Sequence, residues 1–420
     1  MRKNLLIILV AAVCMFTNTI PTFAASTEVD SLVEKLVEKG VLTKAEGREL
    51  KSEIAADEKL MKEENLKVAL PEWVQKMKVK GDYRLRYQYE KKAANAESRS
   101  RGRMRFRLGV ETDIVKDKVK VGAGLATGGT DPRSTNETFE NAFEHGGITW
   151  DYAYAEYLPN SYVKMIGGKF VKSSYLWAPS DMLWDSDINP EGASVHLEKE
   201  LVAKIKGYMN TGVWIIDENN LGDATDPFMH YLQPGVLWKN DTFDIQVAAV
   251  AYKFNGVQGA DLDNDRATNT RTGGVLKYDY DSVGGSFEAG ISRPAESEFP
   301  IERVGILGEY NNNISKFNDG ETDDNDAWTL GMVFGDKKVS NRGKWQFKYL
   351  YTRLEKDSFP DSFPDSDRHA GDTDVSAHEA ILSLGITKNV TFGIDYYDSR
   401  RIKAASDPER LVQADLEFKF

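Results

Sequence analysis

Six arginines occupy every second position of two neighbouring segments of the chain. Side chains of a strand alternate between its two faces, so residues two apart share a face. Guanidinium groups stay ionised and donate directional hydrogen bonds, and a row of them inside a pore attracts anions and carboxylates. We therefore predict a pore-lining basic wall made of Arg84, Arg86, Arg101, Arg103, Arg105 and Arg107. The alternative is that they pair with acidic groups on other walls and only hold the barrel round.

A second group of charged residues lies at 173–191, in a segment too apolar for an ordinary solvated loop. It contains two tryptophans, and its aspartates are Asp181, Asp185 and Asp187. Its large apolar side chains need a surface to pack on. Folding into a barrel would provide that surface and would place the aspartates opposite the arginines, as a constriction with a transverse field. The alternative is a loop packed over the rim or against a neighbouring subunit.

The elements that must position these residues are strands. From about residue 77 onward the apolar residues recur with period 2, and the segments are about as long as a tilted strand needs to cross a bilayer. After the two arginine-rich segments the pattern returns at 119–127, 203–215, 243–251, 287–291, 328–334, 345–351, 378–386 and 390–396. The pattern predicts an all-β protein, with a soluble β-sandwich as the alternative to a membrane barrel.

The connections between these segments fall into two classes. Short polar turns occur at 116–118, 159–160, 239–241 and 388–389, and long loops occur at 128–147, 173–191, 216–228, 255–271, 314–326 and 356–376. Short turns at one end and long loops at the other are typical of a transmembrane antiparallel up-and-down β-barrel. We predict about 16 strands. Eighteen is the alternative, because counts from the two chain ends disagree between residues 272 and 315.

The last nine residues alternate apolar and polar side chains up to Phe420. We expect the apolar set to face lipid and the polar set, Gln413, Asp415, Glu417 and Lys419, to face the lumen. Such a strand must close the barrel against the strand at 78–90.

The start of the chain has the pattern of an export signal. A positive pair, Arg2 and Lys3, precedes a short apolar run, and small residues follow up to Ala24, after which we expect cleavage. We therefore divide the chain into a signal peptide at 1–24, a periplasmic helical, coiled-coil-like module at 25–70 and an outer-membrane barrel at 71–420. Within the module, Thr43 and Glu46 form a capping box; a solvated tether is the alternative.

Composition excludes several functions. The formal net charge of −12 argues against nucleic acid as a partner. Cys14 is the only cysteine and leaves with the signal, so no disulfide or attached haem is expected. The five histidines lack metal-ligand spacing, and no catalytic or phosphate-binding motif is present. We expect no metal, no cofactor and no enzymatic activity. We expect the acidic segments around 323–326 and 357–367 to be solvated loop tips, with weak divalent-ion bridging to lipopolysaccharide as the alternative.

Several motifs resemble the putative porin family of Gram-negative outer-membrane proteins, which is distantly similar to phosphate-selective porins. They are the helical opening at 32–43, the segment at 183–192, Gly308-Glu309-Tyr310 with Asn313, Gly343-Lys344-Trp345, and the loop at 354–357. The resemblance implies a barrel of about 16 strands that forms a homotrimer in contact with outer-membrane lipid and lipopolysaccharide. It also implies that Phe420 belongs to the C-terminal signal recognised by the β-barrel assembly machinery.

The sequence therefore predicts an outer-membrane porin, a water-filled channel for passive diffusion of small hydrophilic solutes or ions, with a preference for anions. Three alternatives stay open. The first is a structural anchor barrel whose amino-terminal helices bind peptidoglycan or a periplasmic partner. The second is a barrel sheath for a separate electron-transfer protein, and the third is an outer-membrane enzyme with catalytic groups on separate strands.

Overall fold

The structure, a computed structural model, describes residues 33–39, 42–53, 56, 71–92, 97–140, 142–219, 226–293, 300–317, 324–404 and 408–420. The chain divides into two compact units, Met1–Gln75 and Lys76–Phe420. The predicted signal peptide lies outside the described residues, as do parts of the predicted helical module.

The first unit contains a pair of short helices, at residues 33–38 and 44–53, and the short helix α4 (Glu72–Gln75). The predicted capping box is confirmed. Thr43 N donates to Glu46 Oε2 at 2.8 Å, and Glu46 N donates to Thr43 Oγ1 at 3.3 Å, so two free N–H groups of the helix start are satisfied. In the described part of the chain, no helix is long and apolar enough to cross a membrane.

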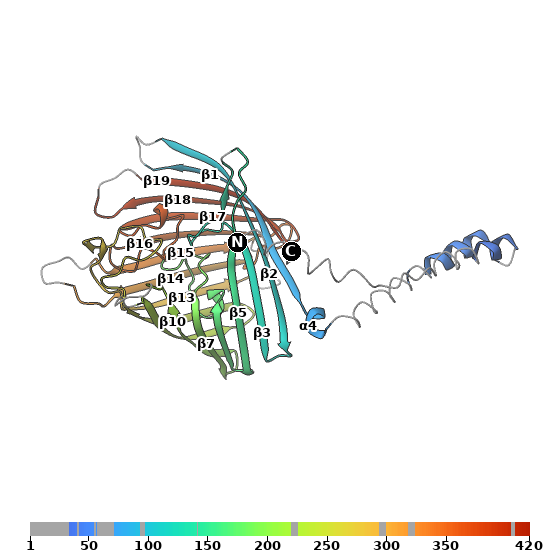
Figure 1. Ribbon diagram of the computed structural model, residues 1–420, viewed down its shortest axis with the longest axis horizontal. Helices are drawn as coiled ribbons and strands as arrows, with labels where there is room; N and C mark the ends of the chain where they lie inside the picture. Colours follow the sequence, from blue (N-terminus) through green and yellow to red (C-terminus); the bar gives the residue numbers. More distant parts are fainter. Residues whose placement is uncertain are drawn as a thin grey trace. The chain divides into compact units, whose positions relative to one another are not determined.

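The second unit is a closed antiparallel barrel, and the described residues form sixteen long strands in its wall (Figure 1). The strands are β1 (Lys78–Lys91), β2 (Ser98–Val115), β3 (Val119–Thr127), β5 (Ile148–Asn160), β6 (Val163–Lys169), β7 (Glu191–Val202), β8 (Ile205–Ile215), β9 (Phe228–Lys239), β10 (Phe243–Asn255), β13 (Ser282–Ser292), β14 (Arg303–Asn313), β15 (Asp326–Gly335), β16 (Trp345–Leu354), β17 (Val375–Thr387), β18 (Val390–Arg401) and β19 (Glu409–Lys419). Each pairs with the next, and β19 pairs with β1. The predicted fold and the count of sixteen are confirmed.

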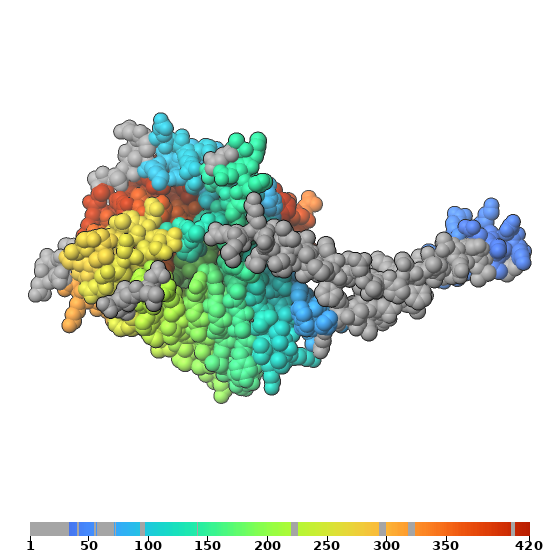
Figure 2. Space-filling model, viewed as in Figure 1, coloured from blue at the N-terminus to red at the C-terminus, as the bar shows by residue number. Residues whose placement is uncertain are grey.

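The structure also explains why counting from the two chain ends disagreed. Strands β11 (Arg271–Thr272) and β12 (Val275–Leu276) form a separate two-stranded sheet inside the loop between β10 and β13. They do not belong to the barrel wall. This loop, in yellow, forms a compact mass in Figure 2. A further short strand, β4 (Glu137–Thr138), pairs with β2 inside another loop.

The two ends of the barrel differ as the sequence predicts. At one end, which we call the turn end, two to four residues join most strand pairs, as at 116–118, 203–204 and 388–389. The first residue of β1 and the last of β19 lie at this end. The opposite end, the loop end, carries the long loops at 128–147, 170–190, 256–281 and 355–374.

The barrel closes at a seam between β1 and β19. Gly81 and Phe420 exchange two backbone hydrogen bonds, of 2.9 and 3.0 Å. Two pairs of aromatic rings lie across the seam on its outer face: Tyr83 stacks on Phe418, and Phe106 stacks on Phe420. The predicted closure of the last strand against the first is therefore confirmed.

Gly81 makes room for the terminal ring. A Cβ at this position would lie 2.3 Å from the carbonyl oxygen of Arg107 and 2.7 Å from the ring of Phe420. We predict that Gly81→Ala displaces Phe420 and costs about 1–3 kcal/mol, as overpacking does. The measurement is the fraction of barrel that keeps its folded, heat-modifiable electrophoretic mobility across a urea series.

The matched control is Gly285→Ala on β13, where the nearest atom to a new Cβ is the Ala248 oxygen at 3.4 Å. It should unfold like the wild type. Equal urea midpoints for the two variants would show that the seam does not need a glycine.

Candidate functional site

The wall strands place the predicted arginines on the inner face of the barrel. Along β1, Tyr87 exposes 54% of its surface on the outer face, whereas its neighbour Arg86 exposes 8%. Strand alternation puts Arg84 on the inner face with Arg86. On β2, Arg105 pairs in register with Arg84 and Arg103 with Arg86, so the same inner face continues onto that strand.

An apolar core fills part of the barrel interior. The loop between β6 and β7 places Trp184 at its centre, with only 3% of the side chain exposed. Its ring contacts Trp214 on β8 and Tyr252 on β10, with centroids 5.3 and 6.1 Å away. It also contacts Phe359 and Phe363 of the loop between β16 and β17, at 5.3 and 4.8 Å. Two loops therefore pack on one another and on the wall inside the barrel.

Amide side chains of the wall hold the backbone of these inserted loops. The side chain of Gln233 on β9 accepts a hydrogen bond from Trp177 N at 2.9 Å and donates to Trp177 O at 2.7 Å. Asn311 on β14 donates to the carbonyl of Ser358 at 3.0 Å. Buried backbone groups need such partners, so the inner wall is matched to the loops in polarity as well as shape.

The expectation that the acidic loop at 357–367 is a solvated tip is wrong. Asp357 and Asp361 expose 3% and 1% of their surface, and Phe359 between them exposes none. The carboxylates are satisfied inside the protein, because Asp361 accepts the backbone N–H of Thr268 at 2.6 Å and Asp357 accepts that of Thr270 at 2.7 Å. Burial is tolerated because another loop supplies the donors.

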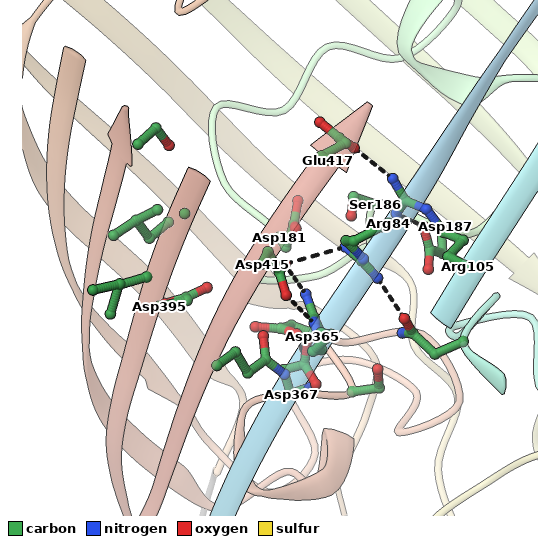
Figure 3. Close-up of a pocket in the computed structure, with 18 of the residues that line it drawn as sticks. Arg84, Arg105, Asp181, Ser186, Asp187, Asp365, Asp367, Asp395, Asp415 and Glu417 are labelled. Carbon is green, nitrogen blue, oxygen red and sulfur yellow. Dashed lines mark hydrogen bonds and ion pairs between the residues drawn. The ribbon is translucent and has the colours of Figure 1, made fainter. Parts of the chain in front are cut away.

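The open space lies along the other side of the interior. A cavity of about 290 Å³, the central cavity, is bounded by β1, β2, β17, β18, β19 and the inserted loops (Figure 3). A cavity of about 320 Å³ toward the loop end shares Arg133, Ser366 and Asp367 with it. A cavity of about 540 Å³ at the turn end shares three other residues with it, Ser383, Thr391 and Glu417. These shared linings place the three cavities in a row along one wall.

Two of the arginines are held in tight ion-pair networks. Arg86 binds both carboxylate oxygens of Asp415 at 2.8 Å. Arg105 binds Asp82 at 2.8 Å and Glu417 at 2.7 Å (Figure 3 shows the contact with Glu417). Bidentate and multiple contacts of this kind are strong and fix the guanidinium plane.

Of the other four arginines, Arg107 is the one that hydrogen-bonds a carboxylate in the described part of the chain. It binds Asp82 at 2.8 Å, whereas Arg84 lies 3.7 Å from Asp415 and Arg101 lies 3.5 Å from Glu90. Arg84 donates to Asn136 Oδ1 at 2.7 Å, and Arg103 donates to the side chains of Gln88 and Ser134 at 3.2 and 3.4 Å. The basic wall is therefore charge-compensated over most of its length.

The three predicted loop aspartates have different surroundings. Asp187 lies 3.5 Å from Arg107 and 3.9 Å from Arg105. Burial alone would favour its neutral form, but the attraction of these guanidinium groups outweighs burial and lowers its pKa. Of the three aspartates, Asp187 is thus the one that meets the basic wall. Asp181 is exposed at the cavity surface.

Asp185 forms a buried acidic pair with the second inserted loop. It accepts the backbone N–H groups of Ser366 and Asp187 at 2.8 and 2.9 Å. Burial, together with the charge of Asp365, holds the pKa of Asp185 well above its ordinary value. Burial raises the pKa of Asp365 to about 6, although the charge of Arg368 opposes the shift.

Sequence reasoning missed several carboxylates that line the central cavity. Asp365 and Asp367 belong to the loop taken as solvated, and Glu379 and Asp395 lie on β17 and β18. The signal for the last two was present, since both strands were predicted and each residue alternates with outward apolar side chains. Phe420 lies at the seam, and its role as an assembly signal stays a prediction.

We predict that Trp184→Ala releases the loop between β6 and β7. Truncating a buried tryptophan costs about 3–5 kcal/mol, and this ring is the centre of the contacts between the two loops. Lys172 is buried, with its ammonium 2.5 Å from the Asp185 carbonyl oxygen. Trypsin should therefore cleave after Lys172 in the variant and spare it in the wild type, as mass spectrometry of the fragments will show.

Trp328→Ala is the matched control, because Trp328 pairs with Tyr351 away from the inserted loops. It should stay as resistant as the wild type. Protection of Lys172 in both variants would mean that Trp184 does not hold the loop.

The fold resembles known outer-membrane barrels. OprB of Pseudomonas putida, in its high-pH structure, superposes with a TM-score of 0.56 at 12% identity, over 83% of this chain and 96% of that chain. A triple mutant of the Rhodopseudomonas blastica porin has a TM-score of 0.43 at 12% identity, over 82% of this chain and all of the other. At such identities the likeness to OprB shows the fold alone.

Sequence comparison gives the family. No curated protein matches the chain. The chain does match the family described as "Putative porin" over residues 89–289 and 299–420. These ranges include every wall strand from β2 onward, except the last three residues of β13, as well as both inserted loops. The chain belongs to the putative porin family and is an outer-membrane channel protein.

Proposed function

We propose that the barrel is a water-filled channel for passive diffusion of small hydrophilic solutes and ions. The observation that carries this proposal is the row of three cavities along one wall, joined by shared polar lining residues from the loop end to the turn end. The apolar core occupies much of the remaining interior, beside two further cavities of about 240 and 390 Å³ that lie against β2, β3 and β5. A path that occupies one side of a sixteen-stranded barrel favours small solutes.

The charge of the path favours cations. Around the central cavity, nine carboxylates face four guanidinium groups: Asp181, Asp185, Asp187, Asp365, Asp367, Glu379, Asp395, Asp415 and Glu417 against Arg84, Arg86, Arg105 and Arg133. An acidic surplus in a narrow aqueous path raises the local concentration of cations. One arginine still supports the anion preference that the arginine rows predict. Among the described residues, no carboxylate lies within 4 Å of Arg103 to compensate its charge.

A structural anchor barrel is the second candidate, and the apolar core inside the barrel favours it. In that case the amino-terminal helices would bind peptidoglycan or a periplasmic partner. The electron-carrier sheath loses support, because a central cavity of about 290 Å³ has no room for a protein partner. Homotrimer formation and insertion by the assembly machinery through Phe420 belong to the same proposal and rest on the family resemblance.

We predict conductance steps for the purified protein in a planar bilayer and a zero-current potential that indicates cation preference in a salt gradient. Arg103→Glu should shift this potential further toward cations, because it replaces a positive side chain in the loop-end cavity with a negative one. The shift should be largest at low salt, where screening is weakest.

Arg410→Glu is the matched control, since Arg410 is exposed and lines none of the three cavities. It should leave the potential unchanged. Absence of conductance steps from folded wild-type protein would overturn the channel and favour the anchor. An equal potential for Arg103→Glu and the wild type would place Arg103 off the permeation path.

A further inference from the structure

Three polar side chains of the closing strands line the central cavity on the same wall as the paired arginines. They are Glu379 on β17, Asp395 on β18 and Gln413 on β19. Asp395 and Gln413 are direct neighbours across the strands, and Glu379 lies one inward-facing position nearer the loop end, opposite Tyr397. We call these three residues the acceptor cluster.

The acceptor cluster holds buried polar atoms without partners. Gln413 exposes 1% of its surface, and neither its Oε1 nor its Nε2 has a hydrogen-bond partner among the described residues. Asp395 Oδ1 is also shielded from solvent and has no partner in that part of the chain. In Figure 3 no dashed line reaches Asp395, whereas Asp415 and Glu417 on the neighbouring strand are joined to arginines. Unsatisfied buried groups are rare in folded proteins and call for an explanation.

The acceptor cluster also lacks a counter-charge. Among the described residues, no lysine or arginine nitrogen lies within 4 Å of the carboxylates of Glu379 or Asp395. The nearby cations are engaged elsewhere or lie farther off: Arg86 binds Asp415 and Asp367, and Arg368 binds Asp365. Lys348 on β16 pairs with Ile381, which lies two residues from Glu379 along β17. A carboxylate away from water takes up a proton unless a cation lies beside it, so a cation in the cavity would stabilise the ionised form.

The geometry indicates which kind of cation fits. A protonated primary amine carries three N–H donors, a number that suits the oxygens of Asp395, Glu379 and Gln413. Ile381, directly opposite Asp395 on β17, also lines the cavity and provides apolar surface for an alkyl stem.

We propose that Glu379, Asp395 and Gln413 form a binding subsite for the protonated amino group of a small organic amine passing through the channel. The subsite rests on the proposed channel function. It names protonated organic amines as the class of cation that the channel prefers. An amine that binds there occupies the narrow path and reduces the current carried by potassium ions while it stays.

The test uses three probes of equal chain length on the purified full chain in a planar bilayer: n-butylammonium, n-butyrate and n-butanol. The solution is about 0.1 M potassium chloride, in which screening is moderate. The concentration of butylammonium that halves the conductance should be at least about tenfold lower than that of butyrate or butanol. A tenfold ratio corresponds to a binding preference of about 1.4 kcal/mol. The double variant Glu379→Gln plus Asp395→Asn keeps the side-chain sizes and should bring the three concentrations together.

A second variant tests the same subsite without removing its acids. Ile381→Lys places a cation opposite Asp395 and should abolish the butylammonium preference in a conducting channel. Glu288→Gln is the control, because Glu288 pairs with Arg303 and lines none of the three cavities; it should keep the wild-type preference.

Conductance without any preference among the probes would overturn the subsite while leaving the channel intact. A preference that survives both variants would assign amine binding to other residues. Absence of conductance would instead overturn the proposed function itself.

Discussion

The insertion of two loops into the barrel is the constraint on which the rest of the site depends. Trp184 is buried among rings from two wall strands and from the second loop, and hydrophobic burial of this kind is the main favourable term in folding. The core it forms fills one side of the interior. The central cavity lies against the wall that carries the arginines and the acids of β17, β18 and β19.

Charge compensation along this wall follows from the same geometry. Arg86 bridges the last strand and an inserted loop through Asp415 and Asp367, so the ion pairs that line the path also attach the loop to the seam. Removing one partner of a buried pair leaves an uncompensated charge and is strongly destabilising. The proposed subsite uses two carboxylates that have no such partner among the described residues, Glu379 and Asp395.

The strands of the barrel wall could be predicted from the sequence, but the contacts inside the barrel could not. Period-2 alternation gave the inward faces of β1 and β2, and the final strand up to Phe420 predicted its own closure against β1. The amino-acid pattern could not show that Arg86 meets Asp367, since a contact across 281 residues depends on how a loop folds back. Nor could it show that Asp361 is buried, because its hydrogen-bond donors come from a different loop. The short strands β11 and β12 have only two residues each, too few for a period-2 pattern, so the sequence could not place them.

The most direct test of this account is the position of the conducting path. The mature chain is expected to lack cysteine, since Cys14 lies in the predicted signal peptide, so single cysteines can be placed without further changes. Ser383 lines both the central and the turn-end cavities, whereas Thr329 is fully buried on the filled side. A charged thiol reagent should reduce the single-channel conductance of Ser383→Cys and leave that of Thr329→Cys unchanged. An unaffected Ser383→Cys channel, or a blocked Thr329→Cys channel, would contradict the path along this wall.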